Sequence, residues 1–94
     1  MSTFLMFGSY SSEALREISE QRTRQVMEMA RQFGGNITAM YALLGAFDLV
    51  LIADFPTNES AVHFSTVASQ ALGISFSTMP AIPVEEFLRV VGRG

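Results

Sequence analysis

Few side chains in this sequence could take part in chemistry. His63 is the only histidine, and the chain has no cysteine. Histidine is the side chain that changes charge near neutral pH, and it can also ligate a metal. At ~100° per residue, His63 lies about 140° from the apolar side of its predicted helix. We therefore interpret His63 as a solvated or rim histidine, and a single histidine without neighbouring carboxylates predicts no metal site.

Asp48 and Asp54 are the acidic pair that could suggest acid–base catalysis. They stand at opposite ends of one predicted strand. At ~3.3 Å per residue the strand separates them by some 20 Å, so the two carboxylates cannot converge on one substrate atom. We expect Asp48 to accept backbone N–H groups of a hairpin turn, with a role as general base in a cleft as the alternative.

Two phenols and two hydroxyls could orient a ligand. Tyr10 follows the first predicted strand and could line the mouth of a cavity, whereas Tyr41 lies in a strand that is apolar on both faces. Ser75 and Ser77 share one face of the last strand, where they either orient a ligand or belong to a partly solvated edge. The sequence thus offers five candidate ligand-binding residues: Tyr10, Tyr41, Asp48, Ser75 and Ser77. No phosphate-loop, dinucleotide-binding or nucleophile-elbow motif occurs, so no cofactor is predicted and no catalytic residue is assigned.

Strands and helices alternate along the chain to position these residues. Apolar patterning predicts strands over residues 3–8, 37–44, 48–55 and 74–79, helices over 12–33 and 58–72, and a short C-terminal helix after Pro83. Gly34-Gly35 and Gly73 predict the ends of the two long helices, and Gly45 supplies a positive φ in the hairpin. The expected buried stripes are Val26, Met29, Ala30 and Phe33 in the first helix, and Ala61, Phe64, Ala68, Ala71 and Leu72 in the second.

The order strand, helix, strand, strand, helix, strand predicts an α+β ferredoxin-like fold, a single domain over residues 1–94. Right-handed crossovers place both helices on one face of a four-stranded antiparallel sheet. The hairpin strands are apolar on both faces, with Ile37, Ala39, Tyr41 and Leu43 opposing Met40, Ala42 and Leu44. Because the helices cover only one face, we expect a second copy to cover the other, giving a homodimer or a higher oligomer.

Composition supports an assembly and excludes several partners. Of the 94 residues 49% are hydrophobic and only 16% are charged, which is more apolar surface than a small monomer needs. The net charge is −3 and the basic residues are all arginines, without a cluster that would bind nucleic acid. No apolar run reaches the ~18 residues of a membrane span. The N-terminus has no secretory signal pattern, and the lack of cysteine fits a reducing compartment, so a cytoplasmic protein is expected.

Several segments together resemble the GYD domain family, over roughly residues 3–87. They include Tyr10-Ser11-Ser12-Glu13-Ala14-Leu15, Phe33-Gly34-Gly35, Met40-Tyr41-Ala42-Leu43-Leu44-Gly45 and Ala53-Asp54-Phe55-Pro56. The family takes its name from a Gly, Tyr and Asp at the hairpin. Gly45 and Asp48 match that pattern here, whereas Phe47 stands where tyrosine is usual and so lacks the hydroxyl. The resemblance implies the plan of the dimeric α/β-barrel superfamily, in which two ferredoxin-like sheets face each other.

The sequence favours a ligand-binding function over catalysis. We expect a small homo-oligomeric protein that binds a small apolar ligand in a cavity beside or between the sheets. The alternative is a small barrel-type monooxygenase or haem-handling enzyme. In that reading the resemblance implies His63 as a haem ligand, because several dimeric α/β-barrel proteins bind haem between helix and sheet.

Overall fold

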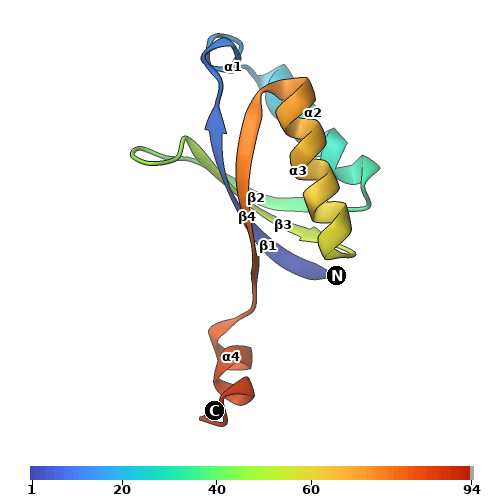
Figure 1. Cartoon of the computed structure of the whole chain (residues 1–94), viewed down its shortest axis with the longest axis vertical. Coiled ribbons are helices and arrows are strands. Elements are labelled where there is room, and N and C mark those ends of the chain that lie inside the picture. The colour runs from blue at the N-terminus through green and yellow to red at the C-terminus, as the bar shows by residue number, and fades with distance from the viewer. Residues whose placement is uncertain (94) are drawn as a thin grey trace.

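The structure is a computed structural model that describes residues 1–93. It is built from four strands and four helices in the order β-α-α-β-β-α-β-α (Figure 1). The elements are β1 (Ser2–Tyr10), α1 (Ser12–Arg16), α2 (Glu20–Gln32), β2 (Asn36–Ala42), β3 (Leu49–Phe55), α3 (Asn58–Leu72), β4 (Ile74–Ala81) and α4 (Val84–Val90).

The four strands form one antiparallel sheet in the order β2-β3-β1-β4. Helices α2 and α3 lie side by side on one face of this sheet, and the described residues leave the other face open (Figure 1). The predicted ferredoxin-like fold is therefore confirmed. The two central strands, β1 and β3, pair with each other over seven residue pairs, and β1 also pairs with the edge strand β4 over eight.

The core fills the space between the sheet and the two long helices. Alternate residues of β3, from Leu49 to Phe55, are all buried there, as the period of two in a strand requires. Phe55 from the sheet and Phe64 from α3 are fully buried, and their ring centroids lie 5.3 Å apart. No polar or charged residue is buried in the described chain, so this core is held by apolar packing.

Helix α3 begins and ends where the sequence predicts. The Thr57 hydroxyl accepts a hydrogen bond from the Ser60 N–H at 3.0 Å, and the Ser60 hydroxyl accepts one from the Thr57 N–H, which forms a capping box. Gly73 closes the helix at φ 68°. One position of the expected stripe was wrong: Ala71 is exposed, because the helix rotates Ala68 and Leu72 toward the core instead.

The expected first helix over residues 12–33 is two helices. α1 ends at Arg16, and a short connection, Glu17–Ser19, leads into α2. Ser19 ends the connection in an extended conformation and caps α2, since its hydroxyl accepts a hydrogen bond from the Arg22 N–H at 3.2 Å. This break exposes Ile18, at 56% of its surface, on the outside of the connection.

A bulge in β2 changes the expected division of the hairpin faces. The pairing register shifts between Ile37 and Ala39. Ile37 therefore joins Met40 on the face toward the helices, whereas the sequence pattern placed Ile37 with Ala39 and Tyr41. The bulged Thr38 donates its hydroxyl hydrogen to the Ile52 carbonyl oxygen at 3.0 Å.

Candidate functional site

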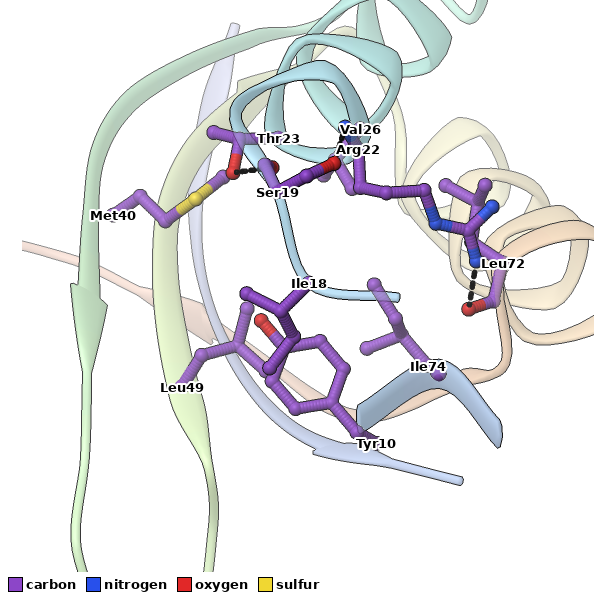
Figure 2. A pocket seen from close by; sticks show the side chains of 11 residues that line it. Tyr10, Ile18, Ser19, Arg22, Thr23, Val26, Met40, Leu49, Leu72 and Ile74 are labelled. Atoms are coloured by element: carbon purple, nitrogen blue, oxygen red, sulfur yellow. Dashed lines mark hydrogen bonds between the residues drawn. The ribbon is translucent and has the colours of Figure 1, made fainter. Parts of the chain in front are cut away.

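A small pocket lies between α2, the Glu17–Ser19 connection and the sheet (Figure 2). Its volume is about 30 Å³. Most of its wall is apolar, from Ala14, Ile18, Val26, Met40, Leu49, Leu72 and Ile74. Four lining residues carry polar groups: Tyr10, Ser19, Arg22 and Thr23. An apolar wall with a few polar groups is the ordinary composition of a small-molecule site.

Tyr10 forms the floor of this pocket. It is the last residue of β1 and pairs with Ile74, so its ring lies on the face toward the helices. Figure 2 shows the ring pointing into the pocket, with its hydroxyl between Ile18 and Leu49. Among residues 1–93 no hydrogen bond joins this hydroxyl to another residue, and because no buried side-chain nitrogen or oxygen atom there lacks a partner, the hydroxyl is open to solvent. Burial, and secondarily the negative charge of Asp48, raises the Tyr10 pKa above its ordinary value of 10.0, so the phenol stays protonated at neutral pH.

Asp48 holds the end of β1 that carries Tyr10. Its carboxylate Oδ2 accepts a hydrogen bond from the Tyr10 backbone N–H at 2.9 Å, and its own N–H donates to the Gly8 carbonyl oxygen at 2.8 Å. The expected partner was the hairpin turn. The structure corrects this: the bonded N–H belongs to the neighbouring strand β1, because Asp48 directly precedes β3, whose Leu49 pairs with Gly8 of β1. Asp48 thus fixes the backbone beneath the pocket.

Arg22 forms the polar wall opposite Tyr10. It lies in the first turn of α2, and its Nη2 donates a hydrogen bond to the Leu72 carbonyl oxygen at 3.2 Å (Figure 2). The same nitrogen lies 3.5 Å from a carboxylate oxygen of Glu17, and the Arg22 side chain is 29% exposed. Arg22 therefore ties α2 to the end of α3 and separates the apolar pocket from a polar groove outside it. That groove has a volume of about 270 Å³ and shares Ala14, Arg22 and Leu72 with the pocket.

The open face of the sheet is the second surface with functional potential. Three rows of residues cross it from β2 to β4, and we call these twelve residues the open face. The rows are Tyr41, Val50, Phe7 and Ser77; Ala39, Ile52, Leu5 and Met79; and Asn36, Asp54, Thr3 and Ala81. The first two rows are mainly apolar, whereas Thr3 donates its hydroxyl hydrogen to an Asp54 carboxylate oxygen at 2.7 Å in the third.

Only two of the five candidate residues lie together. Tyr10 and Asp48 meet at the end of β1, beneath the pocket. Tyr41 and Ser77 lie on the open face at opposite edges of the sheet, roughly 14 Å apart at ~4.8 Å per strand. Ser75 pairs with Ser9 and is exposed beyond the first row. No single site within one chain can therefore contain all five.

Sequence reasoning missed Arg22 and Ile18 as pocket residues. Both were hidden because residues 12–33 read as one helix, so the sequence pattern showed no break between α1 and α2 at which a pocket could form. The missed signal is Ser19-Glu20, a capping residue followed by an acidic residue that favours a new helix start.

His63 and Asp54 lie away from the pocket. His63 is exposed on α3, and its ring lies 4.4 Å from that of Phe33. Asp54 lies toward the other end of β3, as expected. Within residues 1–93 no three His, Asp or Glu side chains gather as metal ligands would. None of the described helices has the length and hydropathy of a membrane span.

A protein-family model for the GYD domain matches residues 4–91, which is nearly the whole chain. The chain belongs to the GYD domain family. No curated protein matches it significantly. In this GYD domain, Phe47 packs against Phe7 on the open side of the sheet, with ring centroids 5.4 Å apart. Phe47 thus uses its ring for packing, and it lies two residues after Gly45, which has φ 117°.

Proposed function

We propose that this GYD domain binds a small, mostly apolar molecule in the pocket between α2 and the sheet. The observation that carries the proposal is the Tyr10 hydroxyl, which points into an apolar pocket and has no hydrogen-bond partner among residues 1–93. No buried side-chain nitrogen or oxygen atom among residues 1–93 lacks a partner, so this hydroxyl is reached by solvent, and a phenol beside apolar surface favours an acceptor that can displace the water. A ligand oxygen would supply that partner.

The chemistry of the pocket defines the ligand class. A protonated phenol donates a hydrogen bond, and a phenol is protonated across the physiological range, which the raised pKa of Tyr10 does not change. Carbonyl oxygens are good acceptors for such a donor. The remaining wall, from Val26, Leu49 and Ile74, favours an apolar ligand body. The expected ligand is therefore a small ketone, aldehyde or related carbonyl compound with an apolar body.

The pocket must widen to admit such a ligand. About 30 Å³ is room for one or two water molecules. The outer wall is formed by Ile18 on the Glu17–Ser19 connection, which belongs to neither flanking helix. Outward movement of this connection would enlarge the pocket without disturbing the sheet or α3. The exposed half of Ile18 indicates that the connection is only lightly packed.

A pair of isosteric probes tests the proposal. Acetophenone carries a carbonyl acceptor, whereas ethylbenzene has nearly the same shape without one. We expect acetophenone to shift the backbone NMR signals of Tyr10, Leu49 and Ile74, and to bind roughly tenfold more tightly than ethylbenzene, the ratio expected for one good hydrogen bond. Tyr10→Phe should remove this preference, and Tyr41→Phe, the matched control on the open face, should keep it. Equal affinity for the two probes in the unmodified chain would refute the role of Tyr10.

We further propose that the protein acts as a homodimer through the open face. Its central residues Leu5, Phe7, Val50 and Ile52 are apolar and only half-buried, and the helices of the same chain cover the opposite side. A contiguous apolar surface of this kind is typical of an interface. The centre of the open face is apolar, and the hydrogen-bonded pair Thr3 and Asp54 lies at its border. Protein interfaces usually have such an apolar core and a polar rim.

Sedimentation tests this assembly. We expect a dimer at micromolar concentration, and we expect Ile52→Glu to dissociate it by placing a charge in the interface. Val62→Glu is the control, because Val62 is 58% exposed on the outside of α3. A stable, soluble monomer of the unmodified chain at micromolar concentration would contradict the proposal.

A further inference from the structure

Helix α4 carries an apolar stripe that its own chain does not cover. Val84, Phe87, Leu88 and Val91 follow the spacing i, i+3, i+4, i+7, which puts them on one side of the helix. Phe87 is 52% exposed and Val84 67% exposed. At ~100° per residue, Glu86 and Arg89 lie about 150° from the centre of the stripe. The helix is therefore amphipathic, with its apolar side in the open.

The position of α4 prevents it from packing on its own domain as it stands. The helix continues the line of β4 beyond the end of the sheet, away from α2 and α3 (Figure 1). Only Ile82 and Pro83 separate it from β4, and every residue from Ile82 to Arg93 is exposed. Pro83 is extended at φ −57° and ψ 146°, which directs the chain outward.

A helix this short needs a partner. It has seven residues, whereas isolated helices below roughly 12–15 residues are marginal in water. It also lacks a side-chain cap at its N-terminus. Packing of the apolar stripe against another surface is the interaction that can hold it. The GYD family model extends to residue 91, so α4 is part of the domain and not an unrelated tail.

The size of the open face indicates which partner fits. A stable interface of standard size involves about 20–30 residues on each side. The open face offers twelve residues, roughly half of that number. Ile82, Pro83 and the four stripe residues add six more, and this segment follows directly from Ala81, which is itself on the open face. The two surfaces together come to eighteen residues, close to the size that a stable dimer needs.

We propose that α4 packs its apolar stripe on a second copy of this chain, so that two copies exchange their C-terminal helices. This goes beyond ligand binding and rests on the proposed pairing of the open faces. The exchange explains why α4 points away from its own core and why the chain is rich in apolar residues. It also makes the C-terminal segment a determinant of assembly.

Cross-linking between isotopically distinct copies tests the exchange in the full-length chain. A benzoylphenylalanine is placed at position 87 in the stripe, or at position 89 on the polar side as the matched control. Equal amounts of ¹⁴N and ¹⁵N protein are mixed, unfolded together and refolded before irradiation. We expect mixed-isotope cross-links from position 87, at about tenfold the yield from position 89.

Two further variants separate this inference from the proposed pairing. Phe87→Asp should weaken the dimer about tenfold, equivalent to one lost apolar anchor, whereas Arg89→Asp should change its dissociation constant less than about twofold. A dimer whose position-87 cross-links stay within one copy overturns the exchange and leaves the open-face pairing intact. A chain that is monomeric throughout overturns both, and the probe comparison at Tyr10 is read independently of either result.

Discussion

Replacing Asp48 by alanine should destabilise the protein by removing one well-defined hydrogen bond. The Asp48 carboxylate accepts the partly buried Tyr10 N–H at 2.9 Å, and the two residues are far apart in the chain. A hydrogen bond to a charged group contributes about 1.5–3 kcal/mol, and its loss leaves the Tyr10 N–H without this acceptor. We expect Asp48→Ala to lower the free energy of unfolding by that amount.

The assay is urea unfolding at a fixed protein concentration, because the proposed dimerisation would make the apparent stability depend on concentration. Asp48→Asn is the matched control, because asparagine keeps an acceptor oxygen in a side chain of the same shape but carries no charge. We expect it to lower the free energy of unfolding by less than about 1.5 kcal/mol. Both variants should bring the Tyr10 pKa closer to its ordinary value, since each removes the Asp48 charge that helps to raise it. Acetophenone binding should survive in both.

An Asp48→Ala protein with unchanged unfolding and no ligand binding would refute this reasoning. Such a result would make the hairpin corner part of the binding site and not a support for β1. Equal losses of stability in the alanine and asparagine variants would show that charge, and not the acceptor position, stabilises this corner.

Three other outcomes follow from the structure. Gly73→Ala should cost at least about 1–2 kcal/mol in urea unfolding, because φ is 68° there and the left-handed conformation penalises a Cβ. The Tyr10 phenol should ionise above pH 10.0 in the folded Tyr41→Phe protein, followed by its absorbance. The Tyr10 pKa is raised in the folded state, so its contribution to stability is fully present below pH 10.0. This contribution is lost as the pH rises through the pKa of the folded protein. Ionisation of Tyr10 at pH 10.0 or below in the folded protein would contradict this prediction. His63→Ala should leave dimerisation and acetophenone binding unchanged, since His63 is exposed on α3; loss of binding in a folded dimer would implicate it.

Most of the fold could be predicted from the sequence because local signals and burial agree. The Thr57 cap, the Gly73 stop and the alternation of β3 each specify an element boundary or a face without tertiary information. The break before α2 could not be read in the same way. The Ser19-Glu20 cap signal stands within residues 12–33, whose pattern is also compatible with one continuous helix. The bulge at Thr38 was similarly hidden, because a shift of one residue leaves the apolar composition of β2 unchanged.

The candidate site was only partly predictable for a related reason. Tyr10 could be named from the sequence, because a phenol at the end of a strand needs a place for its hydroxyl. Of its neighbours, Ile18 lies in the break between α1 and α2, and Arg22 lies in the first turn of α2 just after it. Tyr41, Ser75 and Ser77 were grouped with it because polar groups near apolar strands look alike in sequence. The pairing registers place Tyr41 and Ser77 on the open face and Ser75 beyond its first row, so all three lie away from Tyr10.

The location of the ligand tests the central claim most directly. Intermolecular NOEs can be measured between the acetophenone methyl group and the methyl groups of the folded protein. We predict NOEs to Leu49, Val26 and Ile74, which line the pocket between α2 and the sheet. NOEs confined to Val50 and Ile52 would place the ligand on the open face, between the paired sheets, and would contradict the proposed site.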